Sequence, residues 1–458
     1  MKQIAALGLD WDLEPSFEPW LTRVWNTPGR AVKESPVKLV TRHELEGRVF
    51  FVKRYRHAAA GLRPLKFLFK PAQSRREWRL AQELARRGVP IVRHLAHGER
   101  WTWRGLAESV LITEGFDGVP LDEAERPDLQ AVLRFVEQMH ARGVLQRDLH
   151  PGNVLVGRQT GELRLVDLHG IELKPAISPE ERDANLAFLR IFLPVPVSAE
   201  IERRAALLRR AYLAHRSRRC LKHNREFAPM RFGALRWQVR RPWLTPELEQ
   251  VLGAPDEFLS ARARLLKRGR ASTVGLADGL VLKRYNLRWN KPENLLKDCF
   301  RRSKARRAFR KAYHLELAGV PTARPIATAD VRRCGLLLRS YLVMEAIPDA
   351  ADLGRWRGEP RVALRAAADL IARLHDEGFA HRDLKETNLI FDGQGRLFLI
   401  DLEGLDFEGH VPLPRARADL ARFARAVQSL PHLRDFYRAE FLEPYCRLRN
   451  LNVTGFEP

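Results

Sequence analysis

The chain has 458 residues, of which 45% are hydrophobic and 30% are charged, a balance typical of a globular protein long enough for two domains. Lys and Arg number 80 against 56 Asp and Glu, so the formal net charge is +24. A surface that basic favours anionic lipid, phosphorylated glycan or nucleic acid as a partner. Nucleic acid is the weakest of these expectations, because the sequence has no recognised binding motif and no basic stripe interleaved with aromatic residues.

Targeting signals are not evident. Residues 1–12 turn acidic too soon for a signal peptide, and no apolar run approaches the ~20 residues that a membrane span needs. The four cysteines are widely spaced and form no Cys-x-x-Cys, which favours a reduced protein without structural zinc or disulfides. We therefore expect a cytoplasmic protein whose only membrane contact is peripheral.

The first informative element is a strand over residues 49–55 that carries Lys53. A lysine on a strand about a hundred residues ahead of a catalytic loop would bridge the α and β phosphates of ATP. Taken alone, a lysine at a strand end is usually just solvated. The phosphate-binding lysine needs a carboxylate on the next helix to hold it forward, and Glu77, eleven residues before Gly88, is the candidate.

A catalytic loop is predicted next. A helical pattern ends in His140, which we expect to pack beneath the loop rather than to carry protons. The loop runs from Gln146 to Asn153 and contains an Arg-Asp pair. Asp148 would orient an attacking hydroxyl and accept its proton, while Asn153 would bring an uncharged oxygen to Mg²⁺. After an apolar strand, Asp167 of an Asp-Leu-x-Gly segment would bring a charged oxygen to Mg²⁺.

Basic runs and a bridge mark the organisation of the chain. The runs span 203–219 and 300–311. Most charge runs are solvated helix faces, yet either run could hold the chain at an anionic membrane, since each basic residue there contributes on the order of 1 kcal/mol. A bridge punctuated by Pro and Trp follows the first run. We predict a first domain over 1–225, a linker over 226–254 and a second domain over 255–458.

The same loop pattern recurs more than two hundred residues later. A motif that recurs with its neighbouring segments is much stronger evidence for a catalytic loop than a motif that occurs once. A strand lysine, a loop carboxylate, a loop amide and an Asp-Leu-x-Gly carboxylate recur in the same order. In the second copy these residues are Lys283, Asp383, Asn388 and Asp401.

The second copy differs on its helix. Counting back eleven residues from Gly319 reaches Ala308 where the first copy has a glutamate. Glu316 lies on the same helix but about two turns away, so it is a poor substitute. We therefore expect the first copy to be the more active one, with Asp148→Asn costing more activity than Asp383→Asn.

Each copy is predicted to be a bilobal, protein-kinase-like α+β domain. A small antiparallel sheet with one helix would cover a mostly helical part, and ATP would lie between them. The segments from Asp167 to Asn185 and from Asp401 to Asp419 each advance 18 residues and lack Ala-Pro-Glu. Because this leaves little room for a peptide-docking platform, a small-molecule or glycan hydroxyl is the expected acceptor.

The strand Lys-Arg-Tyr, the helix ending in Gly-Val-Pro, the Arg-Asp-Leu-x3-Asn loop and the Asp-Leu-x-Gly segment together resemble the bacterial lipopolysaccharide core heptose kinase family, which is similar in fold to RIO and eukaryotic-type kinases. The resemblance covers most of the chain, twice. It implies ATP-dependent phosphorylation of an inner-core sugar at the cytoplasmic face of the inner membrane. By motif position it assigns nucleotide binding to the two strand lysines, lysine positioning to Glu77, the base to the loop aspartates, and Mg²⁺ binding to Asn153, Asn388, Asp167 and Asp401.

Departures from the family pattern leave two other readings open. Gln146 stands where the family usually has His, and Leu168 and Leu402 replace the usual Phe. The chain could phosphorylate a soluble metabolite or antibiotic instead, since His150-Pro-Gly is reminiscent of small-molecule phosphotransferases. It could also pair a working kinase with a non-catalytic copy that serves as a scaffold.

Overall fold

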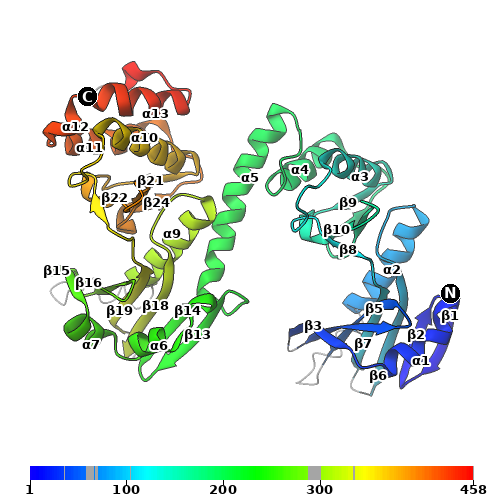
Figure 1. Ribbon diagram of the computed structural model, residues 1–458. Coiled ribbons are helices and arrows are strands. Elements are labelled where there is room, and N and C mark those ends of the chain that lie inside the picture. The colour runs from blue at the N-terminus through cyan, green and yellow to red at the C-terminus, as the bar shows by residue number, and fades with distance from the viewer. Residues whose placement is uncertain are drawn as a thin grey trace. The chain divides into compact units, whose positions relative to one another are not determined.

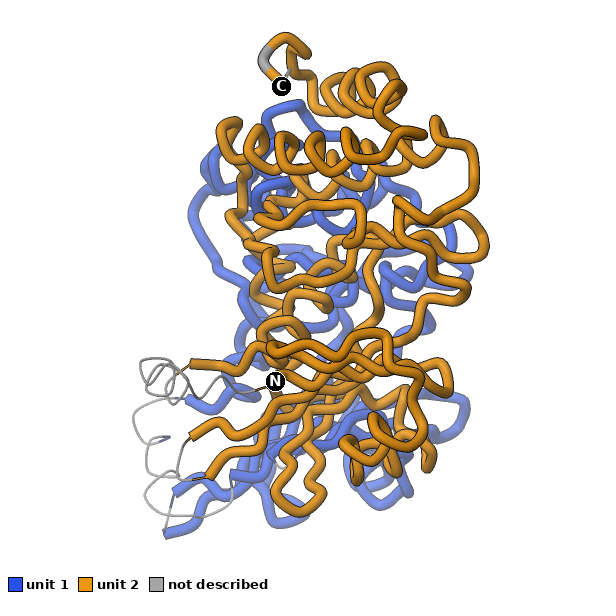
Figure 2. Tube along the Cα trace, turned by 90° about the vertical axis from the view of Figure 1, so that its left-hand side faces the viewer, with its two compact units in different colours: residues 1–208 blue, residues 209–458 orange. Residues whose placement is uncertain are grey.

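The computed structural model describes residues 1–35, 37–57, 67, 71–103, 105–286, 301–333 and 336–456. The chain divides into two compact units, Met1–Leu208 (unit 1) and Arg209–Pro458 (unit 2), and the division falls within helix α5, Ala199–Ser217 (Figures 1 and 2). Each unit combines a large antiparallel sheet with helices. The chain is therefore a mixed α+β protein with two separate sheet domains.

Unit 1 begins with a seven-stranded sheet in which every pairing is antiparallel. Alternate residues of the second strand, Leu9, Trp11 and Leu13, are buried, as expected of a strand with one face on a core. In spatial order the strands are β1 (Lys2–Ala6), β2 (Leu9–Leu13), β6 (His94–Thr102), β7 (Gly105–Glu114), β5 (Arg48–Arg56), β4 (Lys38–Leu45) and β3 (Arg30–Ser35).

Two helices pack on this sheet. Helix α1 (Glu18–Asn26) buries Leu21 and Val24 in one core with Trp11. Helix α2 (Gln73–Arg86) contacts β6 and β7 and buries Trp78.

The remainder of unit 1 is mostly helical and has its own core. Short strands bracket the segments that matter for function, because the predicted loop joins β9 to β10 and the Asp-Leu-x-Gly segment joins β11 to β12. The elements are β8 (Gly118–Pro120), α3 (Leu129–Ala141), β9 (Val144–Gln146), β10 (Val154–Gly157), β11 (Leu163–Leu165), β12 (Ile171–Leu173) and α4 (Pro179–Arg190). Since β9 pairs with β12 and β10 with β11, the strand at each end of the loop is paired with a strand at one end of the Asp-Leu-x-Gly segment.

Unit 2 repeats this arrangement. Its sheet has the same order when the strands are matched one by one: β13 (Phe227–Phe232), β14 (Leu235–Arg240), β18 (Pro325–Arg333), β19 (Leu336–Glu345), β17 (Leu280–Tyr285), β16 (Ser272–Ala277) and β15 (Arg264–Arg268). The matching extends to single residues, because buried Trp11 is paired with Gly98 on β6 and buried Trp237 is paired with Ala329 on β18.

The other elements of unit 2 follow in chain order. They are α6 (Pro246–Gly253), α7 (Pro255–Glu257), α9 (Lys304–Ala318), β20 (Ala351–Asp352), α10 (Pro360–Asp376), β21 (Phe379–His381), β22 (Leu389–Phe391), β23 (Leu397–Leu399), β24 (Leu405–Phe407), α11 (Leu413–Gln428), α12 (Pro431–Arg434) and α13 (Glu443–Leu448). Among the described residues, none of the helices combines the length and the apolar character that crossing a lipid bilayer requires.

The linker expected over 226–254 is a folded part of unit 2. It forms the hairpin β13–β14 and helix α6, and it buries Phe227, Trp237 and Val239. Its prolines look like linker residues in the sequence, but Pro229 is exposed on a strand at the edge of the sheet and Pro246 begins a helix, the places where proline is tolerated. The first unit correspondingly ends near residue 208 rather than 225.

Each sheet is also larger than the predicted small sheet with one helix. The additional hairpin brings each sheet to seven strands, and each sheet carries a second helix, α1 in unit 1 and α6 in unit 2.

Candidate active sites

In unit 1 the structure brings Lys53 and Glu77 together. Lys53 lies on β5 and Glu77 on α2, and the lysine Nζ donates to Glu77 Oε1 at 2.7 Å. Glu77 is only 7% exposed. Burial acts to raise the pKa of Glu77, but the charge of Lys53 and the nearby His94 outweigh it and lower the pKa to about 2. Glu77 is therefore ionised at neutral pH.

His94 is a third member of this cluster, and it belongs to none of the motifs that select the other site residues. It is the first residue of β6, and its ring is almost fully buried. Its Nδ1 donates to the carbonyl of Val92 at 2.8 Å, and its Nε2 lies 3.5 Å from Glu77 Oε1. His94 reaches the same carboxylate oxygen as Lys53 because the fold places strand β6 against helix α2. No sequence motif links these two elements.

The loop of unit 1 is held by its own side chains. Gln146 donates from Nε2 to the carbonyl of Asp167 at 3.0 Å and accepts from the Asp148 N–H at 3.3 Å. Asn153 donates from Nδ2 to the carbonyl of Asp148 at 3.1 Å. These bonds connect the loop to the Asp-Leu-x-Gly segment and leave the carboxylates of Asp148 and Asp167 exposed.

The loop of unit 2 makes the same bonds with a different residue. His381 donates from Nε2 to the carbonyl of Asp401 at 3.2 Å and accepts at Nδ1 from the Asp383 N–H at 3.3 Å. Asn388 donates to the carbonyl of Asp383 at 2.7 Å. Burial lowers the pKa of His381, which keeps this tautomer neutral. Gln146 therefore reproduces the histidine's two hydrogen bonds, and this departure from the family pattern leaves the loop intact.

His140 and His375 pack beneath the loops, which confirms their structural interpretation. His140 Nε2 lies 2.9 Å from Asn185 Oδ1, and Asn185 in turn donates to the carbonyl of Gln146. In unit 2, His375 Nε2 lies 3.4 Å from Asp419, whose carboxylate accepts from the His381 N–H at 2.6 Å.

Unit 2 lacks the helix carboxylate, as the sequence indicated. Ala308 is buried on α9, and both oxygens of Glu316 are bonded to Arg240 at 2.9 Å. Lys283 instead lies 3.1 Å from Asp401 and 3.1 Å from Glu403.

The loop carboxylate of unit 2 is also occupied. Asp383 Oδ2 pairs with Lys385 at 2.9 Å, and Arg422 lies 3.6 Å from Oδ1. The hydrogen bond from Lys385 lowers the pKa of Asp383.

The residues selected for Mg²⁺ have suitable free atoms. Because the amide nitrogen of each loop asparagine donates to a backbone carbonyl, its amide oxygen is the atom that can bind a hard cation. Asp167 adds an exposed carboxylate in unit 1. Within the described residues no group of three His, Cys, Asp or Glu side chains could hold a metal ion on its own, so a cation here would depend on these mixed ligands and on substrate oxygens.

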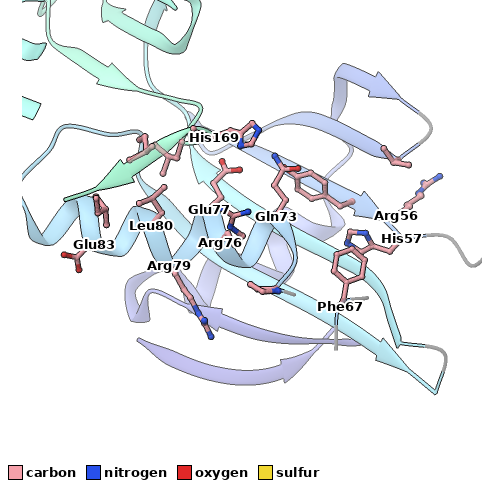
Figure 3. A pocket seen from close by; sticks show the side chains of 17 residues that line it. Arg56, His57, Phe67, Gln73, Arg76, Glu77, Arg79, Leu80, Glu83 and His169 are labelled. Atoms are coloured by element: carbon pink, nitrogen blue, oxygen red, sulfur yellow. The ribbon is translucent and has the colours of Figure 1, made fainter. Parts of the chain in front are cut away.

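A cavity of about 860 Å³ borders Glu77 in unit 1 (Figure 3). Its walls come from α2, from the end of β5 and from the segment that follows Asp167. Arg56, Arg76 and Arg79 bring three positive charges to its lining, against the carboxylates of Glu77 and Glu83. The space beside the Lys53–Glu77 pair therefore suits an anionic ligand.

Comparison with known proteins matches both units. The model of the "Lipopolysaccharide kinase (Kdo/WaaP) family" matches residues 22–212 and 269–441, well over half of the chain. The 3-deoxy-D-manno-octulosonic acid kinase of Stenotrophomonas maltophilia is 33% identical over 147 residues, which cover 31% of this chain and 56% of that protein. The kinase of the same name from Vibrio cholerae is 36% identical over 93 residues, covering 20% and 39%.

The lipopolysaccharide core heptose(I) kinase WaaP of Pseudomonas aeruginosa is 27% identical over 184 residues, covering 35% of this chain and 69% of that protein. The chain spans about half the length of most of these curated relatives. A solved structure, "WaaP in complex with acyl carrier protein", is 23% identical with a TM-score of 0.32 and covers 44% of this chain and 86% of that one. On the extent of the family match, the chain belongs to the lipopolysaccharide kinase (Kdo/WaaP) family.

Proposed function

We propose that this chain transfers the γ-phosphoryl group of ATP to a hydroxyl of a lipopolysaccharide inner-core sugar, and that unit 1 is the principal catalyst. The observation that carries the proposal is the 2.7 Å bond between Lys53 and buried Glu77, in a unit whose loop also presents Asp148 and Asp167 to solvent. Unit 2 has no such helix carboxylate.

The roles of the unit 1 residues follow from their positions. Glu77 holds Lys53 forward, so its ammonium can contact the nucleotide phosphates. Asp148 is free to orient the acceptor hydroxyl and take its proton, while Asn153 and Asp167 offer oxygens for Mg²⁺. Bound Mg²⁺ would neutralise the phosphate charge. The sheet and the helical part would then act as the two lobes of a kinase, with the nucleotide between them.

The acceptor is an inner-core sugar, and two sugars are supported. Heptose is the prediction from the sequence. The octulosonic acid is the second candidate, because several relatives are named for its phosphorylation. Arg56, Arg76 and Arg79 around the cavity favour an anionic acceptor of this kind over a neutral metabolite or antibiotic.

Peripheral contact with an anionic membrane surface is part of the proposal. Its support is the net charge of +24 together with arginines that remain exposed, including Arg216, Arg218, Arg302 and Arg307. Not all of the basic run over 203–219 is available, because Arg209 pairs with Glu377 and Arg210 donates to the carbonyl of Gly409.

A division of labour between the units is also supported. Asp383 is paired with Lys385 and Arg422, whereas the exposed carboxylate of Asp148 has no ion-pair partner within the described residues. Unit 2 would then contribute more to ligand binding than to phosphotransfer.

The test is a transfer assay on defined acceptors. Purified chain, ATP and Mg²⁺ are incubated with dephosphorylated core oligosaccharides that end in octulosonic acid or extend to heptose, and with an aminoglycoside as a small-molecule comparison. Mass spectrometry should find one added phosphate on a core oligosaccharide, and the fragment that carries it identifies the sugar. Phosphorylation of the aminoglycoside alone would replace this proposal with the small-molecule one.

A further inference from the structure

Helix α9 of unit 2 provides no carboxylate to the strand lysine. Ala308 holds the place of Glu77 and is packed in a core with Ala305 and Phe309. Glu316, the only acidic residue of the helix, is bonded through both oxygens to Arg240. If unit 2 had only lost the function of unit 1, we would expect Lys283 to have no carboxylate that fixes its position.

Lys283 is instead held by the Asp-Leu-Glu-Gly segment. Glu403, two residues past Asp401, places Oε1 3.1 Å from Lys283 Nζ. Its other oxygen, Oε2, lies 3.2 Å from the Nζ of Lys304, the first residue of α9. One carboxylate therefore joins strand β17, helix α9 and the segment that carries the predicted metal ligand.

A second contact supports this bridge. Lys311, two helical turns after Lys304, donates to the carbonyls of Leu402 and Glu403 at 3.2 and 3.3 Å. Helix α9 is thus attached to the segment at both ends of a two-turn stretch. In unit 1 the Lys53–Glu77 bond joins the strand directly to the helix, and the residue in the place of Glu403 is His169, which cannot act as an anion.

We infer that Glu403 is the positioning residue of unit 2, holding Lys283 from the Asp-Leu-Glu-Gly segment as Glu77 holds Lys53 from the helix, and that unit 2 thereby binds the phosphates of a nucleoside triphosphate. The inference rests on the nucleotide site proposed above. Ala308 then does not indicate that unit 2 has lost lysine positioning, because another element of the same unit supplies the carboxylate.

The test isolates unit 2 within the full-length chain. Lys53→Ala removes the phosphate-binding lysine of unit 1, and calorimetry then measures binding of a non-hydrolysable ATP analogue with Mg²⁺. Glu403→Gln in this background should weaken binding about tenfold, since a charge-assisted bond to Lys283 is lost. Glu359→Gln is the matched control, because Glu359 is exposed ahead of α10 and makes no side-chain capping bond.

Rescue separates positioning from mere structural support. Adding Ala308→Glu to Glu403→Gln restores a carboxylate at the unit 1 position and should recover most of the lost affinity. Amide hydrogen exchange along α9, measured without nucleotide, should quicken in Glu403→Gln and stay unchanged in Glu359→Gln.

The outcomes distinguish this inference from the proposed function. Unchanged affinity and unchanged exchange in Glu403→Gln would overturn it, as would the absence of analogue binding in the Lys53→Ala parent, even if the wild-type chain phosphorylates core sugar. Failure of the wild-type chain to phosphorylate any acceptor, with Glu403-dependent binding intact, would instead refute only the proposed function.

Discussion

Replacing Glu77 with Gln removes one charge from the buried pair of unit 1 and keeps the shape of the side chain. Lys53, whose side chain is only 17% exposed, is then left without its anionic partner. The fall in the pKa of Glu77 from 4.5 to about 2 corresponds to about 3 kcal/mol of stability at neutral pH. This agrees with the lower end of the 3–5 kcal/mol that breaking a buried ion pair typically costs.

The pH dependence of this contribution has a definite sign. Because the pKa of Glu77 is lower in the folded state, its stabilisation is complete above about pH 4.5 and is lost as the pH falls toward 2. The difference in stability between the wild type and Glu77→Gln should therefore be largest at neutral pH and shrink across that acidic window.

Native-state hydrogen exchange read peptide by peptide measures the effect in unit 1 and uses unit 2 as an internal reference. At neutral pH, amides of β5 and α2 that exchange only through unfolding of unit 1 should exchange about a hundredfold faster in Glu77→Gln. Glu83→Gln is the control on the same helix, since Glu83 pairs with Arg86 and Arg87 at the surface and should leave exchange nearly unchanged. Equal exchange of Glu77→Gln and Glu83→Gln would show that the Lys53–Glu77 pair does not stabilise unit 1.

Three further predictions use other parts of the chain. Gln146→His should retain near wild-type phosphotransfer, because His381 makes the same two bonds in unit 2. Gln146→Leu should lower the initial rate of phosphotransfer at least tenfold, since it makes neither bond. Trp237→Ala should destabilise unit 2 by about 3–5 kcal/mol in denaturant titration, and a negligible change would return its segment to the status of a linker. Binding to anionic vesicles should weaken strongly from low to high salt in a sedimentation assay, and salt-independent binding would remove the argument from charge.

The sequence predicted the parts of each unit whose motifs occur in both units. Repetition of the loop singled out Asp148 and Asp383, and the period of the preceding helix placed His140 correctly beneath it. The absence of a glutamate at Ala308 was equally readable, because a fixed count from a glycine defines the position on the helix.

The sequence could not show contacts that depend on the packing of distant elements. His94 approaches Glu77 only because strand β6 lies under helix α2, and no motif connects them. Glu403 stands at the variable position of Asp-Leu-x-Gly, where any residue satisfies the pattern, so its bonds to Lys283 and Lys304 emerge only in three dimensions.

Composition also misled at one place. The prolines of residues 226–254 indicated a linker, although buried Trp237 lies in the same register as Trp11 of the first unit. Proline at a strand edge or a helix start has the same appearance in a sequence as proline in a connecting segment. An internal comparison of the two tryptophans would have been the better guide.

Unit 1, which contains the Lys53–Glu77 pair, is proposed to transfer phosphate to an inner-core sugar. The most direct measurement of this transfer follows radiolabel from the γ position of ATP into dephosphorylated core oligosaccharide for the wild type, Asp148→Asn and Asp383→Asn. We expect Asp148→Asn to lose about a hundredfold or more of the transfer rate, because a general base is removed, while Asp383→Asn keeps most of it. Loss confined to Asp383→Asn, or no labelled sugar with the wild-type chain, would contradict this proposal.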